Sequence, residues 1–420
     1  MSSAMKTLIS LGLAHALLEW FSGVWPIFKV LAHLDLATSA KIVAATSFLA
    51  SILQPVFGMW ADKGYAKRMA LIGTAATFLL MLVGPISNQM PVWGPLCVYA
   101  VLGGVTLLSR LGHSAFHPAG ASLAAHAFDG QRHTSSIGIF ISMGWIGYGL
   151  SQIAFSAAYL NLNGHTEILL IPGAIVMLWI MAWCKPASQP HARAHYPWSE
   201  KMRDIWGYRR DIGLLFALLC LTGAANSALF FLFPEFLAEK GYSGWVLNGG
   251  AQGFMIAGTA LGVVISGYCA EGMGERFALL VAMAMNIIAW HGFLMMPLLP
   301  STVFLPACLV IGMLFGFGST LPISMGQKLI PRNASMISGV MMGWTWALGN
   351  LAPMAAAYLA ENPQLRMYGA LTILGVLNVL ALICAIFLKP APQASPAIHV
   401  AAPVSTVATS QSSTRLPVQS

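Results

Sequence analysis

Gly58-Met59-Trp60-Ala61-Asp62-Lys63-Gly64-Tyr65-Ala66-Lys67-Arg68 is a charged turn that joins two long apolar runs. A carboxylate followed by a dense patch of cations is costly at the end of a membrane helix, so such an arrangement usually has a function. A degenerate second copy starts 209 residues later and reads Gly267-Tyr268-Cys269-Ala270-Glu271-Gly272-Met273-Gly274-Glu275-Arg276. Two copies in corresponding places indicate a duplicated membrane unit, which is typical of transporters.

The composition is that of a polytopic membrane protein. Of the 420 residues, 57% are hydrophobic and only 8% are charged, and the mean hydropathy is +0.74. Soluble domains carry about 25% charged residues, and a soluble chain this apolar could not cover its surface. The net charge of +8 comes from cations in short loops beside helices, a pattern that indicates anionic lipid headgroups rather than nucleic acid.

The cysteine and histidine patterns predict no cofactor, metal site or enzyme active site. The six cysteines are scattered singly, without the paired spacing of a disulfide framework or a zinc site. No histidine pair stands with a carboxylate in the spacing of a known metal motif, and no nucleophile–base constellation is visible. The first apolar run lacks the cleavage site of a signal peptide, and we expect it to remain as the first helix.

The apolar windows predict an all-α protein with twelve transmembrane helices, arranged as two pseudo-symmetric six-helix bundles. Each window is long enough to cross a bilayer. They are residues 7–30, 40–60, 69–87, 93–116, 135–160, 167–184, 212–237, 246–269, 277–297, 302–327, 335–359 and 367–388. The predicted organisation is a first half at 1–184, a cytoplasmic linker at 185–211, a second half at 212–388 and a disordered tail at 389–420.

A second repeat supports the duplication. Met143-Gly144-Trp145 recurs as Met342-Gly343-Trp344 at an offset of 199 residues, in the fifth window of each half. Parallel repeats about an axis along the membrane normal enclose a central cavity. We therefore expect the substrate site between the two halves.

The distribution of Lys and Arg predicts the orientation. Sixteen of these cations fall on the side of the two termini and the linker, whereas the opposite loops hold only Lys29, Lys41, Lys240 and Arg366. Cationic loops stay in the cytoplasm. We expect a multi-pass protein of the cell inner membrane with both termini inside the cell.

Three segments carry a family resemblance, and they read Leu13-Ala14-His15-Ala16-Leu17-Leu18-Glu19, Leu53-Gln54-Pro55-Val56-Phe57-Gly58, and Gly112-His113-Ser114-Ala115-Phe116-His117-Pro118. Together with the charged turn, they resemble the fosmidomycin-resistance branch of drug-efflux proteins in the major facilitator superfamily. The resemblance implies two six-helix halves that rock around a central site. The chain departs from that branch at Ala119-Gly120, where an acidic residue is usual, and at Arg110, where a small residue is expected.

Ionisable residues inside the predicted helices are the candidates for coupling and binding. His15 and Glu19 are spaced i and i+4, and Arg110, His113 and His117 are spaced i, i+3 and i+7, so each set shares one helix face. We expect Arg110 to lie near Glu19, Glu19 to carry the coupling proton, and His15 to tune its proton affinity. The alternative is a fixed pair of Glu19 and Arg110 that only joins two helices. His117 precedes Pro118 and could instead serve the end of its helix.

The charged turn has its own predicted role. Asp62 can accept hydrogen bonds from the N-terminus of a facing helix, and Lys67 and Arg68 can pair across the boundary between the halves. The family resemblance implies that this turn latches the outward-open state. The residues assigned to this conformational latch are Gly58, Asp62, Lys63, Gly64, Lys67, Arg68, Glu271 and Arg276. The alternative is that the cations only set topology.

The second half offers fewer polar groups. Asn226, in the seventh window, and Asn350, in the eleventh, are uncharged candidates for substrate binding. Glu235 falls at the outer end of its helix, where we expect it at the membrane interface. This asymmetry predicts that the proton site belongs to the first half.

The resulting hypothesis is a monomeric secondary transporter that exports a small, anionic or drug-like molecule by proton antiport. Its partners would be that substrate, protons and membrane lipid. One alternative is a proton-coupled uptake symporter for an organic anion. A different class of alternative is a membrane sensor or assembly protein that does not transport, although such a protein has no need of buried charge.

Overall fold

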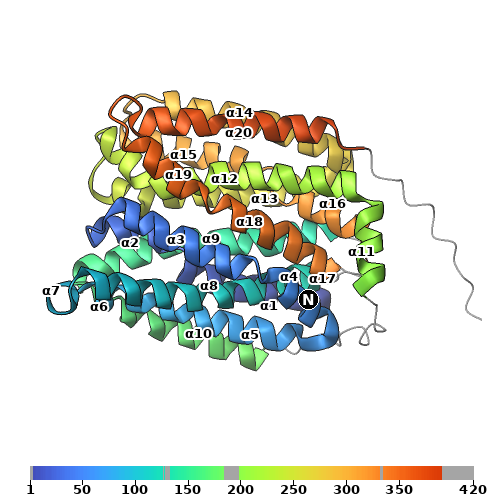
Figure 1. Cartoon of the computed structure of the whole chain (residues 1–420), viewed down its shortest axis with the longest axis horizontal. Helices are drawn as coiled ribbons and strands as arrows, with labels where there is room; N and C mark the ends of the chain where they lie inside the picture. The colour runs from blue at the N-terminus through green and yellow to red at the C-terminus, as the bar shows by residue number, and fades with distance from the viewer. Residues whose placement is uncertain (1–2, 126, 128–132, 184–197, 332–333, 390–420) are drawn as a thin grey trace, which may run out of the picture. The chain divides into compact units, whose positions relative to one another are not determined.

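The helices run side by side along one direction (Figure 1). This computed structural model describes residues 3–125, 127, 133–183, 198–331 and 334–389. The described residues up to Lys389 form one unit, and within them there is no β-strand. Residues 185–197 of the predicted linker and residues 390–420 of the predicted tail lie outside the described residues.

The first half contains the following elements, in chain order: α1 (Ser3–Ser22), α2 (Trp25–Leu31), α3 (Leu36–Ser51), α4 (Gln54–Trp60), η1 (Ala61–Tyr65), α5 (Ala66–Thr77), η2 (Phe78–Leu82), α6 (Val83–Ser87), α7 (Met90–Trp93), α8 (Pro95–Ala125), α9 (His133–Asn161), η3 (Thr166–Leu169) and α10 (Leu170–Trp183). The second half contains α11 (Trp198–Gly207), α12 (Arg209–Glu239), η4 (Val246–Gly250), α13 (Ala251–Met273), α14 (Glu275–Met295), α15 (Ser301–Gly316), α16 (Leu321–Leu329), α17 (Ala334–Ser338), η6 (Gly339–Trp344), α18 (Thr345–Gly349), α19 (Ala352–Ala360) and α20 (Arg366–Ile386).

Nine helical segments of the described chain are long and apolar enough to cross a membrane. One of them, residues 36–87, has 52 residues, which is about 78 Å of helix and more than two bilayer crossings. It reverses at Gly64, whose φ of +96° is a left-handed conformation that glycine adopts without strain. With the shorter helices of residues 166–183 and 334–360, the arrangement is consistent with the predicted twelve crossings.

Several crossings are broken where the sequence predicts continuous helices. The first crossing breaks at Gly23 between α1 and α2, and Pro26 lies in the first turn of α2, where its missing N–H costs nothing. The fourth crossing is longer than predicted, because α8 continues through Pro118 to Ala125. The tenth is interrupted between α15 and α16, and this break lies beside the cavity described below.

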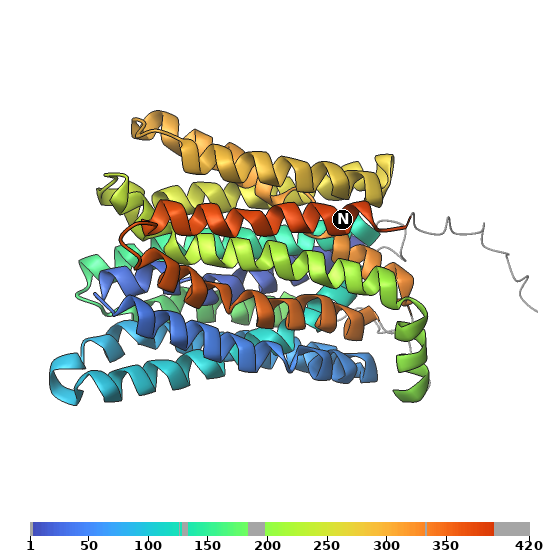
Figure 2. The same cartoon turned by 45° about the horizontal axis from the view of Figure 1, so that its top comes forward.

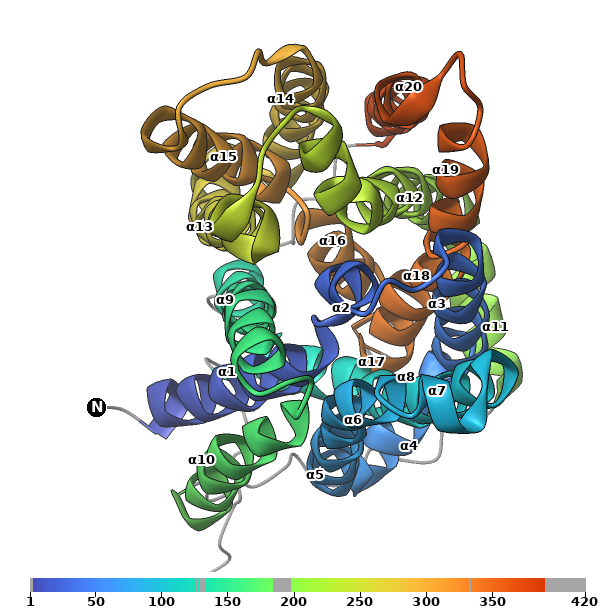
Figure 3. The same ribbon diagram turned by 90° about the vertical axis from the view of Figure 1, so that its left-hand side faces the viewer.

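The two halves contact each other mainly where α9 packs on α13, where α2 packs on α12, and where α3, α4 and α8 pack on the segment from α17 to α19. In the view along the helices, most of the first half lies below and most of the second half above (Figure 3). Small residues permit the close approach of helices. A Cβ on Gly147 of α9 would lie 1.9 Å from the backbone oxygen of Ala16 in α1.

Contacts between the halves occur at both ends of the unit. At the end that carries the α2–α3 loop, called here the Lys29 end, buried Lys29 of α2 forms an ion pair with Glu235 of α12. The sequence pattern counts Lys29 with the loops, and this assignment is wrong, because Lys29 lies in α2 and is buried. The side chain of Glu235, four residues before the end of α12, is 22% exposed. The two charges can be buried together because their mutual attraction offsets part of the desolvation cost of each.

The opposite end, called here the Asp62 end, carries η1, the start of α9 and the linker helix α11, which lies across the ends of the other helices (Figures 1 and 2). Here Glu275 of the second half accepts a hydrogen bond from Thr134 of α9 at 2.8 Å. Glu275 also pairs with Lys328 at 3.1 Å. The cavity between these two ends is therefore bounded by contacts between the halves on both sides.

Candidate functional site

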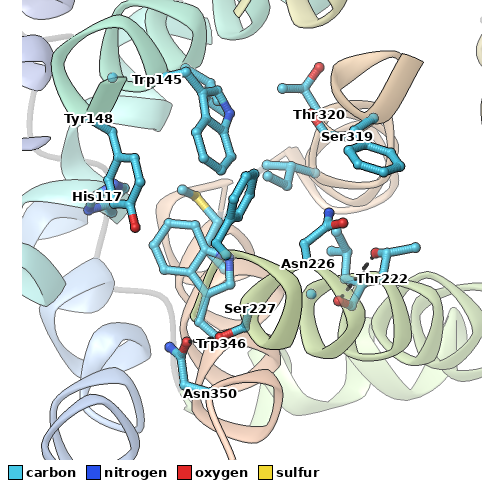
Figure 4. Close-up of a pocket in the computed structure, with 18 of the residues that line it drawn as sticks. His117, Trp145, Tyr148, Thr222, Asn226, Ser227, Ser319, Thr320, Trp346 and Asn350 are labelled. Atoms are coloured by element: carbon cyan, nitrogen blue, oxygen red, sulfur yellow. Dashed lines mark hydrogen bonds between the residues drawn. The ribbon is translucent and has the colours of Figure 1, made fainter. Parts of the chain in front are cut away.

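A cavity of about 280 Å³ lies between the two halves. Both halves line it, and the close-up view places His117 and Tyr148 on one side, with Thr222, Asn226, Ser319 and Thr320 on the other (Figure 4). Trp145 and Trp346 lie between these two walls in the same view. The predicted location of the site between the halves agrees with this cavity.

Glu19 of α1 is the only carboxylate among the residues that line the cavity. Its Oε1 lies 2.9 Å from Nε2 of His113, 3.2 Å from Nε2 of His117 and 3.5 Å from Nε2 of His15. All four side chains are at most 11% exposed. The helix-face pattern predicted that each set shares one face, and the structure brings the histidines of the α8 face to Glu19.

Arg110 and Glu19 line the same cavity, as predicted, but they form no ion pair with each other. Within the described part of the chain, Arg110 makes no hydrogen bond or ion pair, and its Nε is buried without a partner. The imidazoles reach Glu19 instead because they lie one and two turns further along α8 than Arg110. Arg110 lines the cavity, so its charge is left for whatever enters.

Two features fix the ring of His15. Its Nδ1 donates to the backbone oxygen of Phe140 at 2.8 Å, and its ring stacks on Phe140 with centroids 4.3 Å apart. Its other face meets Gly144, where an added Cβ would lie 2.5 Å from the ring. The imidazole is therefore held with Nε2 toward Glu19.

His117 does not serve a helix end, contrary to that alternative. It lies inside α8, and its Nδ1 donates to the backbone oxygen of His113 at 2.8 Å. Its Nε2 lies 3.0 Å from Nε2 of His15. The ring also contacts Trp346 of the second half, with centroids 4.9 Å apart.

The expectation that these residues do not form a metal-binding set needs correction. One ligand atom each from His15, Glu19 and His117 lies within 4.8 Å of the other two, a grouping that could hold a metal ion. Sequence spacing did not reveal it, because the two histidines are 102 residues apart and belong to different helices.

The polar candidates of the second half both line the cavity. Asn350, at the end of α18, accepts a hydrogen bond from Ser227 at 2.8 Å. The Oδ1 atom of Asn226 in α12 is buried and has no hydrogen-bond partner. Asn226 is therefore available to a bound molecule, whereas the oxygen of Asn350 is already engaged.

Ser319 and Thr320 also line the cavity and were not predicted. They occupy the break between α15 and α16, where Gly318 adopts a φ of +87°, and their hydroxyl oxygens have no hydrogen-bond partner. The N-terminus of α16 begins at this break. The signal in the sequence is Gly316-Phe317-Gly318-Ser319-Thr320, because two glycines and two hydroxyl residues in an apolar window disfavour a continuous helix.

At the Asp62 end, part of the predicted latch is in contact between the halves. Gly58 packs on α17, since an added Cβ would lie 2.6 Å from the backbone oxygen of Ser335. In the second copy, Glu271 accepts from the backbone N–H of Ser135 at the start of α9, at 3.0 Å. A bond of this kind, between a carboxylate and a facing helix N-terminus, was predicted for Asp62 of the first copy; the structure shows it for Glu271 of the second.

The cations of the latch do not behave as predicted. Lys63, Lys67 and Arg68 are exposed and form no ion pair within the described residues. Arg276 bonds to the backbone oxygen of Ile386 at 3.2 Å, inside its own half. The predicted pairing of Lys67 and Arg68 across the boundary is thus absent from the described structure.

Comparison with known proteins places these features in a family. The sequence model of the Major Facilitator Superfamily matches residues 7–352. The fosmidomycin resistance protein of Escherichia coli (strain K12) is 23% identical over 380 residues, which cover 85% of this chain and 86% of that protein.

Solved structures share the fold at low sequence identity. A mutant of the nucleoside transporter NupG matches with a TM-score of 0.66 at 14% identity, over 92% of this chain and 100% of that one. A mutant of the Escherichia coli fucose:proton symporter FucP matches with a TM-score of 0.60 at 13% identity, over 91% and 98%. An inward-facing, unoccupied bacterial homologue of the human lysosomal transporter Spinster matches with a TM-score of 0.66 at 15% identity, over 92% and 98%.

Proposed function

This chain belongs to the major facilitator superfamily and is a multi-pass membrane transporter, and from that premise we propose that it exports a small anionic molecule in exchange for protons. It would act as a monomer in the inner membrane, with both termini in the cytoplasm. The observation that carries the proposal is the division of charge in the cavity. Glu19 is surrounded by imidazoles from α1 and α8, while Arg110 makes no hydrogen bond or ion pair within the described residues.

The cavity favours an anion. Arg110 contributes a full positive charge that nothing in the described chain neutralises by contact. The N-terminus of α16 opens at the cavity wall, and helix N-termini attract negative charge, as in other transporters with interrupted helices. The cavity volume of about 280 Å³ suits a small organic molecule, near the lower end of the range for ligand pockets.

The Glu19 cluster favours proton coupling. A carboxylate at this depth is expensive unless it is neutralised, and its neighbours are histidines, whose protonation changes readily near neutral pH. Protonation of Glu19 and binding of an anion at Arg110 both change the charge of one enclosed space. Each event therefore alters the free energy of the other, which is the requirement for coupled transport.

Alternating access needs two gates that open in turn. We assign one gate to the ion pair of Lys29 and Glu235, and the other to the Asp62 end, where Glu271 caps α9 and Gly58 packs on α17. The latch role of Asp62 and Gly64 belongs to this second gate. Lys63, Lys67 and Arg68 are exposed and make no ion pair in the described structure. Their main role would then be to set the orientation of the chain in the membrane.

Uptake by symport is the second candidate, and one observation favours it. The fucose:proton symporter FucP has the same fold, so this architecture is compatible with proton-driven uptake. Antiport and symport differ in the sign of proton movement that accompanies substrate.

The test uses purified protein in liposomes that contain a pH-sensitive dye. Phosphonates and organic acids are added outside, one at a time. Antiport predicts that the interior becomes alkaline as substrate enters, and symport predicts that it becomes acidic. No response to any compound, from protein shown to be folded by size-exclusion chromatography, would count against coupled transport of small anions.

Variants assign the two roles. We expect Glu19→Gln to abolish substrate-dependent proton movement while exchange of labelled for unlabelled substrate continues. Arg110→Gln should raise the KM for the substrate. Matched substitutions at exposed positions, Glu361→Gln and Arg203→Gln, should leave both measurements unchanged.

A further inference from the structure

The tautomers of His15 and His117 follow from their partners. Each Nδ1 lies 2.8 Å from a backbone carbonyl oxygen, that of Phe140 for His15 and that of His113 for His117. A carbonyl oxygen can only accept, so both Nδ1 atoms carry the hydrogen. In the neutral imidazoles, both Nε2 atoms are then unprotonated acceptors.

These two acceptors converge on a third. The Nε2 atoms of His15 and His117 lie 3.0 Å apart, and Oε1 of Glu19 lies 3.5 Å from the first and 3.2 Å from the second. Three lone-pair atoms at such distances repel one another unless a proton or a metal ion lies among them. The cluster can therefore hold either occupant.

The dimensions of this triangle match a tetrahedral metal site. Ligand bonds of about 2.0–2.1 Å to zinc place neighbouring ligand atoms of a tetrahedron about 3.3 Å apart. The three measured separations, 3.0, 3.2 and 3.5 Å, bracket that value. Two imidazoles and one carboxylate are a donor set for zinc, cobalt or nickel rather than for magnesium or calcium, which take oxygen ligands.

We propose that His15, Glu19 and His117 form a binding site for a divalent transition-metal ion of the zinc class, with its fourth position open to the central cavity. All three residues line the cavity, which provides the route of entry and the space for water or an anion as the fourth ligand. Three protein ligands and one open position are the arrangement in which zinc binds an exchangeable ligand.

The surroundings of the triangle also fit a metal site. Histidine ligands commonly donate the second ring N–H to a backbone carbonyl, as both histidines do here. His113 directs its Nε2 to Glu19 at 2.9 Å, so it can orient the carboxylate from outside the triangle. Gly144 and Phe140 hold the ring of His15 from its two faces. The ligand atoms are thus oriented before an ion arrives.

A proton and a metal ion are alternative occupants of the same acceptor atoms. A bound ion would therefore block the proton exchange proposed for Glu19, and binding would release any proton held there. The metal site does not depend on the proposed direction of transport or on the substrate. Its test is a binding measurement, so it can fail while the transport proposal stands, and the reverse.

The experiment uses full-length protein in detergent, freed of metal with a chelator and of any histidine tag. Calorimetric titration with zinc chloride should show one ion bound per chain. Cobalt chloride should give the intense visible absorption of four-coordinate cobalt, which a six-coordinate surface-bound ion lacks. The cobalt spectrum is measured on the unmodified protein, so this test remains valid even if a substituted variant fails to fold.

Substitutions locate the ion. His15→Gln, Glu19→Gln and His117→Gln should each weaken zinc binding by at least about tenfold and reduce the cobalt spectrum. His165→Gln, at an exposed histidine that pairs with Glu167, should change neither. Failure of the unmodified protein to bind zinc at millimolar concentration would overturn the proposal, as would binding that survives all three substitutions.

Discussion

The indole of Trp346 meets the imidazole of His117 edge-on, with ring centroids 4.9 Å apart. The two rings belong to different halves, because Trp346 lies in α18 and His117 in α8. Trp346 also lies 5.7 Å from the ring of His113. One side chain of the second half therefore touches the charged cluster of the first, and any rocking of the halves must change this contact.

Replacement of Trp346 should weaken the link between that cluster and the moving half. An edge-on aromatic pair contributes about 0.5–1.5 kcal/mol, so Trp346→Ala is expected to raise the KM for substrate by about twofold to tenfold. Trp346→Phe should retain most of the affinity. Trp206→Ala, at an exposed position on α11, is the matched control, and an equal effect there would contradict the assignment.

Single substitutions of Lys29 and Glu235 should lower the stability of the folded protein by unequal amounts. The side chain of Lys29 is 1% exposed and that of Glu235 is 22% exposed. Glu235→Ala leaves a fully buried cation and should destabilise the protein by about 3 kcal/mol, whereas Lys29→Met leaves a carboxylate with access to water and should cost less. The melting temperature in detergent measures both changes.

A double substitution and an exposed pair serve as controls for this prediction. Lys29→Met combined with Glu235→Met should recover most of the lost stability, since no charge remains buried. Glu239→Gln breaks a pair with Arg366, whose side chain is 66% exposed, and should cost less than about 1 kcal/mol. Equal losses at the buried and the exposed pair would show that Lys29 is not enclosed as described.

Asp35 gives a prediction about pH from outside the membrane-spanning helices. Its Oδ2 accepts a hydrogen bond from the backbone N–H of Thr38 at 2.7 Å and so caps α3. Hydrogen bonds from the side chain and the backbone of Thr38 lower the pKa of the Asp35 carboxyl below its usual value. The ionised cap therefore stabilises the folded protein above the unfolded pKa of about 3.9, and this stabilisation is lost as the pH falls through the lower folded value.

Asp35→Ala should cost about 0.5 kcal/mol at pH 7, at the low end for a helix cap because the site is exposed. The difference in melting temperature between the unmodified protein and this variant should shrink once the pH falls below about 4. Asp35→Asn keeps a capping oxygen that does not titrate. Its melting temperature, compared with that of Asp35→Ala, should therefore show no such loss over the same range of pH.

The fold was predictable from the sequence because long apolar windows and the duplicated turn constrain it strongly. Within the site, the i, i+4 spacing of His15 and Glu19 and the i, i+3, i+7 spacing of the α8 set correctly predict two facing helix surfaces. Helical periodicity fixes the face on which a residue lies, but not its depth relative to a residue on another helix. Helical periodicity therefore could not show that Glu19 contacts the imidazoles and not Arg110.

The misplacement of Lys29 has another cause. Lys29 was counted with the loop cations because a lone charge is costly to bury, and the partner that offsets this cost, Glu235, is 206 residues away. The burial of Lys29 is thus decided by a tertiary contact and not by local propensity.

Gly144 connects the sequence repeat to the site, and its substitution gives the sharpest test of the packing. An added Cβ would lie 2.5 Å from the ring of His15, closer than any real contact, so Gly144→Ala must displace the imidazole. We expect a cost of about 1–3 kcal/mol in stability from overpacking, together with weaker zinc binding and reduced proton-coupled transport. The control is Gly104→Ala, where no atom lies within 4 Å of the added Cβ. That change should be neutral or slightly stabilising, because alanine favours a helix over glycine. If Gly144→Ala were equally neutral, then His15 would not be held against α9, and the geometry of the acceptor triangle would lose its support.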